Sequence, residues 1–241
     1  MANVHPAQEA LSSRLTRVRE QIAAAAERSG RRVEEVTLIA ISKTHPASAI
    51  ERLIELGATD IGENRVQEAE EKIPEIGRGK ARWHLVGHLQ ANKARRAVNL
   101  FDVIHSLDSI DLAQRLDRLC VEQGRDKLQV LIQVDLGHEE TKSGIDESEL
   151  PQLIAELGPL HRIQLIGLMT LPPFFENPEQ DRPFFRHLRK LRDELASGGA
   201  FGDQPGELSM GMTHDFEVAI EEGATMVRIG TAIFGERAAR H

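Results

Sequence analysis

The sequence contains no tyrosine, and it has only one cysteine, Cys120, among its 241 residues. A single cysteine excludes a disulfide bond within the chain, which favours a reducing compartment. Cys120 lies in the helical pattern of residues 112–124, so we predict a small buried side chain rather than a reactive thiol. The missing tyrosine removes one of the side chains that commonly act as general acids or bases in enzymes.

The sequence also lacks any apolar run long enough to cross a membrane. Residues 1–21 are too polar to hold the apolar core of a signal peptide. The formal net charge of −8 argues against a protein that binds nucleic acids by general electrostatic attraction. We therefore expect a cytoplasmic protein that binds neither membranes nor nucleic acids.

What the sequence does contain is a regular alternation of strand-like and helical patterns. A predicted helix at residues 7–30 is followed by eight apolar runs, each with a helical pattern behind it except the last. These runs are residues 36–43, 59–64, 81–88, 101–108, 128–136, 163–171, 206–212 and 225–235. Such alternation predicts a parallel α/β sheet, and eight units in this length favour a closed (β/α)8 TIM barrel over an open doubly wound sheet.

We predict that residues 1–241 form a single domain, with the barrel at residues 36–235. No self-complementary apolar patch is evident, which favours a monomer. The longest irregular segment, residues 172–183, is rich in proline and is expected to form a rim or lid element.

Polar residues gather where the predicted strands end, which is the edge at which TIM barrels carry their active sites. The residues at these ends are Ser42, Lys43, Thr44, Gly62, Glu63, Asn64, Arg65, His84, His88, His105, Ser106, Met169, Thr170, Ser209, Met210, Gly211, Arg228, Gly230 and Thr231. His84 and His88 suggest a metal site, but they lack the glutamate and the helix of the HExxH motif, so we predict none. The concentration of polar groups at one end of several strands predicts a binding site there.

Lys43 and Arg228 are the strongest candidates within this site. Taken alone, a lysine or an arginine at such a position is more often a solvated residue than one that takes part in chemistry. Strand side chains alternate between the two faces, so Arg228 lies opposite Val227 and Ile229 and is expected to point into the barrel mouth. Closure of the barrel would make the first and last strands neighbours. The sequence therefore predicts that this lysine and this arginine share one site.

Small and hydroxyl residues follow the last two predicted strands, at 209–211 and 230–231. Barrels commonly hold phosphate at this position, because backbone N–H groups can approach an anion there. A reactive lysine, a nearby cation and a phosphate cradle together indicate pyridoxal 5′-phosphate (PLP). Lys43 would form an imine with the aldehyde, and Arg228 would face the pyridine nitrogen.

Several motifs in the same order resemble the YggS/PROSC family of PLP-binding proteins, also called PLP homeostasis proteins. They are AISKTHP (40–46), IGENRVQE (61–68), WHLVGHLQANK (83–93), ETKSG (140–144), GLMTLPP (167–173), LSMGMTHDFEVAI (208–220) and VRIGTAIFG (227–235). The resemblance spans nearly the whole chain. It implies a fold-type III barrel like the N-terminal domain of alanine racemase, and a role in storing, buffering or delivering PLP. The expected partners are PLP, related B6 vitamers and PLP-dependent apoenzymes.

The resemblance also assigns roles to individual residues. Lys43 matches the lysine that forms the imine, and Arg228 matches the arginine near the pyridine nitrogen. The residues matched to phosphate-binding segments are Ser209, Gly230 and Thr231, with Met210 and Gly211 contributing backbone. Asn64 matches an asparagine near the cofactor, and Met169, Ser106 and His84 are weaker candidates for contacts with the ring or the pocket wall.

Two functions remain open at this point. The first is a carrier that holds PLP, and the second is a PLP-dependent amino-acid racemase or related enzyme. Racemases that resemble alanine racemase use a lysine and a tyrosine as two bases, and this sequence has no tyrosine. We also expect no second domain that would close the site and exclude water. A histidine or cysteine could serve as the second base, so the enzyme stays an alternative, but the carrier is favoured.

Overall fold

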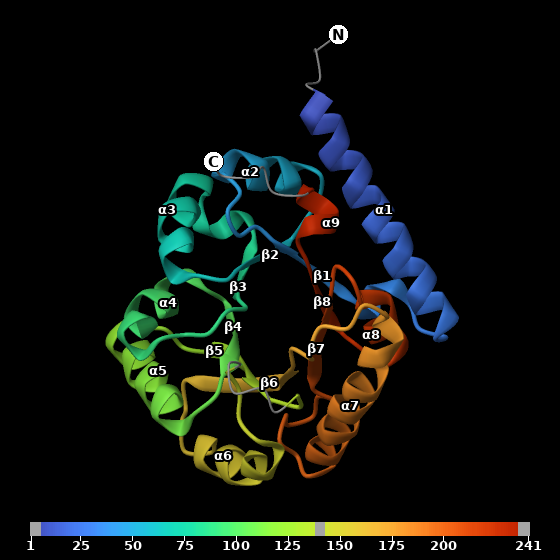
Figure 1. The fold of residues 1–241 in the computed structure, drawn as a ribbon. Helices are drawn as coiled ribbons and strands as arrows, with labels where there is room; N and C mark the ends of the chain where they lie inside the picture. The colour runs from blue at the N-terminus through green and yellow to red at the C-terminus, as the bar shows by residue number, and fades with distance from the viewer. Residues whose placement is uncertain (1–5, 138–142, 236–241) are drawn as a thin grey trace.

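The computed structural model describes residues 6–137 and 143–235, with the backbone alone for residues 6–9. Its eight parallel strands close into a barrel in sequence order, with β8 paired to β1 (Figure 1). This confirms the predicted TIM barrel. The strands are β1 Thr37–Ile41, β2 Asp60–Glu63, β3 Arg82–Leu85, β4 Val103–Leu107, β5 Leu128–Gln133, β6 Ile163–Met169, β7 Glu207–Met212 and β8 Met226–Ile229.

Helices surround the barrel on its outside (Figure 1). Those in the described ranges are α1 Pro6–Arg28, α2 Ala47–Glu55, α3 Val66–Ile76, α4 Ala94–Leu100, α5 Ile110–Glu122, α6 Leu150–Leu157, α7 Arg182–Ser197, α8 Phe216–Glu221 and α9 Thr231–Phe234. Short 3₁₀ helices are η1 Val33–Glu35, η2 Arg78–Lys80, η3 Ala91–Lys93, η4 Glu147–Glu149 and η5 Pro178–Asp181. No helix among the described residues is both long and apolar enough to span a lipid bilayer.

The strands are apolar on both faces because each face is covered. Outward residues such as Val227 and Ile229 pack with the helices in one large apolar cluster, which also contains the fully buried Cys120. Inward residues form smaller clusters inside the barrel, one of which joins Ile39 and Ile41 to Met226 and Val86. This division matches the two-residue period of a strand. Only the inward-facing side chains can therefore reach a site in the barrel mouth.

Helix α1 lies along the outside of the barrel, next to α8 and α9 (Figure 1). Its buried residues Leu15, Val18 and Ile22 recur at helical spacing, so one stripe faces the barrel. The Arg14 guanidinium donates hydrogen bonds to the carbonyl oxygens of α9 residues Ile233 (2.7 Å) and Phe234 (3.2 Å). The α1 helix therefore covers the flank beside β8, where the last strand is followed only by the four-residue α9.

Every observed strand is shorter than the run predicted for it, and two of these differences affect the site. The run 225–235 was expected to be one strand, but β8 ends at Ile229, and Gly230 precedes the short helix α9. The run 81–88 ends as a strand at Leu85, so His88 lies in a loop and does not share a strand face with His84. In both cases a buried apolar residue beyond the strand continues the strand-like pattern: Val86 packs inside the barrel, and Ile233 packs in the large outer cluster.

Candidate functional site

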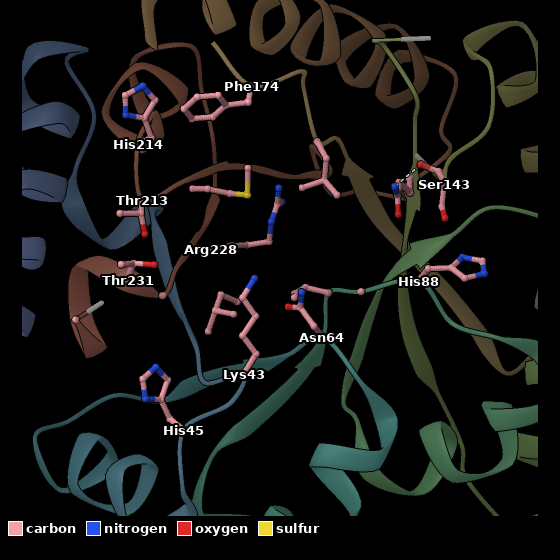
Figure 2. Close-up of a pocket in the computed structure, with 18 residues that line it drawn as sticks. Lys43, His45, Asn64, His88, Ser143, Phe174, Thr213, His214, Arg228 and Thr231 are labelled. Carbon is pink, nitrogen blue, oxygen red and sulfur yellow. Dashed lines mark hydrogen bonds between the residues drawn. The ribbon is translucent and has the colours of Figure 1, made fainter. Parts of the chain in front are cut away.

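A pocket with a volume of about 530 Å³ opens at the carboxyl ends of the strands (Figure 2). Of the residues predicted from the sequence, it is lined by Lys43, Asn64, Arg228, Gly230 and Thr231. The other lining residues are Ile41, His45, Val86, Gly87, His88, Gln133, Ser143, Leu171, Phe174, Met212, Thr213, His214 and Gly235. None of these described lining residues is acidic, although the chain as a whole carries a net charge of −8.

Lys43 lies just beyond β1, on the turn that follows the strand, and its amine points toward Arg228 (Figure 2). The next residue, Thr44, has a φ of 67°, in the left-handed region that a β-branched residue rarely adopts. Its N–H group donates a hydrogen bond of 2.7 Å to Glu68 Oε2 on α3. This contact offsets the strain of the turn and holds the backbone that carries the lysine.

A buried ion-pair network lies behind the same turn. Lys72 Nζ donates to the Ser42 carbonyl oxygen (2.9 Å) and to Glu63 Oε1 (2.8 Å), and it also contacts Glu68 Oε2 (3.2 Å). The Ser42 hydroxyl donates to Glu63 Oε1 at 2.7 Å. Burial raises the pKa of the Glu63 carboxyl, while Lys72 and Ser42 act in the opposite direction. The network therefore joins β1, β2 and α3 directly beneath Lys43.

Arg228 forms part of the inner wall of the pocket and is only 4% exposed. Its guanidinium donates to Ser209 Oγ (2.6 Å) and to the Thr170 carbonyl oxygen (2.9 Å). Burial lowers the pKa of Arg228 to about 10, and the charge of Asp215 opposes that shift. The Arg228 side chain is thus still positive at neutral pH. An inward-pointing positive side chain is suited to bind an anionic or electron-rich ligand.

Thr213 and Thr231 lie beside each other on one side of the pocket, whereas Ser143 lies on the opposite side (Figure 2). Thr213 follows β7 and Thr231 begins α9, so both hydroxyls come from the loops after the last two strands. A Cβ atom at Gly230 would lie 3.2 Å from the carbonyl oxygen of Ile41, which leaves little room for any other residue there. These segments form the small-residue side of the pocket.

Ser209, predicted to bind phosphate, lies below the pocket instead of lining it. The β7–β8 register pairs Ser209 with Met226 and Met212 with Arg228, so Ser209 is deeper in the barrel than the arginine. Its hydroxyl is fully buried and is engaged by Arg228 and His105. At the level of the pocket, Met212 and Thr213 take the place that was predicted for Ser209.

Met210 and Gly211, predicted to contribute backbone to a phosphate site, also fall outside the pocket lining. Met210 points outward into the apolar cluster beneath the helices. A Cβ atom at Gly211 would lie 2.6 Å from the Cβ of Ala219, so α8 covers this position.

The three weaker candidates are buried away from the pocket as well. Met169 packs inside the barrel with Val103 and Leu131. The Ser106 hydroxyl donates to the Gly87 carbonyl oxygen at 2.8 Å, which supports a pocket loop from behind. His84 is fully buried in the barrel interior.

Sequence reasoning missed several lining residues. Thr213 and His214 directly follow the seventh predicted strand run, 206–212. Their position just after a strand could have identified them as candidates for the pocket. His45 stacks on Phe234 with ring centroids 4.4 Å apart. Phe174, in the predicted rim segment 172–183, is 78% exposed and contacts His214 with ring centroids 5.4 Å apart. Long-range contacts of this kind leave no pattern in the sequence.

The motif at residues 140–144 lies mostly outside the described residues, which include only Ser143 and Gly144 of it. The Gln133 amide donates to the Ser143 carbonyl oxygen, and both residues line the pocket. Within the described ranges, no group of three or more histidine, cysteine or acidic side chains could hold a metal ion.

Comparisons with known proteins agree with this architecture. A family model described as "Alanine racemase, N-terminal domain" matches residues 14–238. A pyridoxal phosphate homeostasis protein of Aquifex aeolicus is 45% identical over 93% of this chain and 97% of its own length. The protein of that name from Escherichia coli K12 is 43% identical, with 94% and 97% coverage.

A solved structure is also similar to this chain in sequence and in fold. PipY of Synechococcus elongatus, described as having PLP bound, is 38% identical and superposes with a TM-score of 0.77. The match covers 93% of this chain and all of that chain.

The buried network beneath Lys43 leads to a prediction about stability. Lys72→Met leaves the buried Glu63 carboxylate without its positive partner, so we expect a loss of about 3–5 kcal/mol in the free energy of unfolding at pH 7. Chemical denaturation of the variant and the parent measures it. The double variant Lys72→Met/Glu63→Gln, which buries no charge at this position, should recover part of the loss.

The loss of unfolding free energy in Lys72→Met should change with pH in a defined direction. Burial raises the pKa of Glu63 in the folded protein, and loss of Lys72 should raise it further. A carboxyl with a raised folded pKa costs stability only once the pH exceeds its unfolded pKa. The unfolded state is common to variant and parent, so the deficit of Lys72→Met arises only above the folded pKa of Glu63 in the parent. It should therefore shrink as pH falls toward that pKa, which itself lies above about 4.3, the ordinary value for glutamate. A deficit that is constant from neutral to acid pH would contradict this account.

Proposed function

The chain belongs to the family of pyridoxal phosphate homeostasis proteins, and from that premise we propose that it binds PLP through Lys43 and serves the storage, buffering or delivery of this cofactor. The observation that carries the proposal is the meeting of the Lys43 amine and the Arg228 guanidinium in one pocket beside Thr213 and Thr231 (Figure 2). This arrangement offers a separate partner to each polar part of PLP.

The phosphate group fits the side of the pocket formed by the loops after β7 and β8. Thr213 and Thr231 supply hydroxyl donors there, and Gly230 allows the backbone to approach a ligand closely. The N–H groups of Ile233 and Phe234 in the short helix α9 already donate to the Gly230 carbonyl oxygen, so only the backbone at its very start can offer donors beside the Thr231 hydroxyl. The absence of acidic side chains from the described lining favours a ligand with negative charge.

Lys43 fits the role of the residue that attaches the cofactor. PLP would supply an aldehyde and the deprotonated Lys43 amine would hold it: a C=N bond would replace the aldehyde C=O bond, and the oxygen would leave as water with the two amine hydrogens. A nearby positive charge disfavours the protonated form of an amine, and Arg228 lines the same pocket. The turn held by Glu68 and Lys72 keeps the amine directed into the pocket.

Arg228 fits the position of the pyridine nitrogen. Because it is held from the barrel interior by Ser209 and Thr170, it can present only its remaining N–H groups to a ligand. A guanidinium donates hydrogen bonds and does not accept them, so the facing ring nitrogen would be unprotonated. An unprotonated ring withdraws electrons less strongly, which suits a protein that holds PLP more than one that uses it.

The location, the oligomeric state and the partners of the protein are proposed as well. We propose that the protein acts as a cytoplasmic monomer of one domain, that it binds related B6 vitamers, and that PLP-dependent apoenzymes receive PLP from it. They rest on the sequence and on the names of the relatives.

The attachment of PLP to Lys43 can be tested directly. Incubation with PLP should produce a new visible absorbance band, and borohydride reduction followed by peptide mass spectrometry should place the cofactor on Lys43. Lys43→Ala should lose both signals. The matched control is Lys80→Ala, which removes an exposed lysine outside this pocket. Full visible absorbance in Lys43→Ala would overturn the assignment.

The phosphate side can be tested with two ligands. Thr231→Ala and Thr213→Ala each remove a hydroxyl donor to a charged group, so their affinity for PLP should fall about tenfold. Their affinity for pyridoxal, which lacks the phosphate, should change much less. Equilibrium titration of both ligands measures the difference. Equal losses for PLP and pyridoxal would refute a phosphate role for these residues.

The racemase alternative requires a second base facing Lys43. The described lining offers His45, His88 and His214 for that role, and the sequence has no tyrosine. We expect no conversion when the PLP-loaded protein is incubated with separate L- and D-amino acids and analysed by chiral chromatography. Time-dependent inversion that is lost in Lys43→Ala would establish the enzyme instead of the carrier.

A further inference from the structure

A chain of hydrogen bonds leads from the pocket wall into the barrel. Arg228 donates to Ser209 Oγ (2.6 Å), and Ser209 Oγ lies 2.9 Å from His105 Nδ1. His105 Nε2 lies 2.8 Å from His84 Nδ1, and His84 Nε2 lies 2.9 Å from Asp60 Oδ1. All five residues are buried, and they come from strands β8, β7, β4, β3 and β2. The chain therefore crosses the inside of the barrel from one wall to another.

The two ends of the chain determine the direction of every bond in it. A guanidinium can only donate, so Ser209 Oγ accepts from Arg228 and must donate its own hydrogen to His105 Nδ1. An ionised carboxylate can only accept, so His84 Nε2 carries the hydrogen that it shares with Asp60. The central bond then runs from His105 Nε2 to His84 Nδ1. Both histidines are thus neutral and carry hydrogen on Nε2.

The surroundings support these charge states. Burial lowers the pKa of His84 and lowers that of His105 well below the ordinary value, which keeps both rings neutral at pH 7. Burial alone would raise the pKa of Asp60, but the hydrogen bonds from His84 and Thr59 outweigh it and leave the pKa lowered. Asp60 therefore stays ionised and remains an acceptor.

Core filling alone does not explain this chain. Apolar residues of similar volume fill a barrel interior without the cost of removing polar groups from water. Here each polar group in the chain finds a partner, and the chain ends on the one member that lines the pocket. Its members fix one guanidinium nitrogen, while the Thr170 carbonyl oxygen fixes a second. The orientation of Arg228 therefore depends on residues that do not reach the pocket.

We propose that Ser209, His105, His84 and Asp60 are positioning residues for Arg228: they hold its guanidinium in place and link its charge to the Asp60 carboxylate through a one-way hydrogen-bonded chain. This inference rests on the proposed function, in which Arg228 recognises the ring nitrogen of PLP. It assigns Ser209 a role in ring recognition, distinct from the phosphate role that the sequence suggested.

The first test measures recognition of the ring nitrogen. The two probes are PLP and an analogue in which a C–H group replaces that nitrogen. The parent protein should bind PLP about tenfold more tightly than the analogue, as expected for one hydrogen bond to a charged group. Ser209→Ala should reduce this ratio to about threefold or less, and the remote Asp60→Asn should also reduce it.

The matched control is Thr225→Val, which removes a hydroxyl that bonds the backbone N–H of Leu208, the residue before Ser209, but lies outside the chain. Its ratio should equal that of the parent protein. Retention of the parent ratio by both Ser209→Ala and Asp60→Asn would overturn the proposal. Equal binding of the two probes by the parent protein would overturn it too.

The second test needs no PLP and so separates this inference from the proposed function. Nitrogen-15 NMR of labelled histidine at pH 7 should show His84 and His105 as neutral rings with hydrogen on Nε2. Ser209→Ala should shift the Nδ1 resonance of His105, and folding of the variant is verified by the unchanged signals of exposed histidines. A hydrogen on Nδ1 of either ring, or a protonated ring, would overturn the chain even if PLP binds as proposed.

Discussion

The pairing of β1 with β8 is the interaction on which the site depends. These strands come from opposite ends of the barrel sequence, and their register places Ile39 beside Arg228. Lys43 follows just beyond the end of β1, so closure brings its amine into the same pocket as the guanidinium, toward which it points (Figure 2). The outer helix α1 supports this seam through the hydrogen bonds from Arg14 to α9. Neither charged residue would have a site without that closure.

Burying a charged side chain inside a barrel costs free energy, and the surrounding residues compensate for that cost. A buried ion is tolerated only when hydrogen bonds and counter-charges replace the water that it loses. Arg228 is therefore held by Ser209 and Thr170, and the buried Glu63 carboxylate behind the Lys43 turn is paired with Lys72. Glu63, Lys72 and Ser209 lie on β2, α3 and β7, and Thr170 directly follows β6, so the site is fixed more firmly than loops alone could fix it.

The sequence was sufficient for the fold and for the two charged residues, because both follow from periodicity. Alternation of strands and helices predicts the barrel, and the two-residue period predicts that Arg228 points inward. Periodicity cannot tell how deep a residue lies along the barrel axis. Ser209 also points inward, but the β7–β8 register sets it below Arg228. The link between His84 and His105 depends on side-chain contacts between separate strands, which no local pattern records.

The position of the counter-charges explains how an acidic protein can present a positive pocket. Glu63 and Asp60 are buried behind the walls, where they neutralise Lys72 and end the chain from Arg228. Neither carboxylate lines the pocket, so a ligand would meet Lys43 and Arg228 without meeting an acidic side chain among the described lining residues. In the proposed binding mode, a cation at the ring nitrogen would keep that nitrogen unprotonated, and an unprotonated ring is a weaker electron sink for bond cleavage.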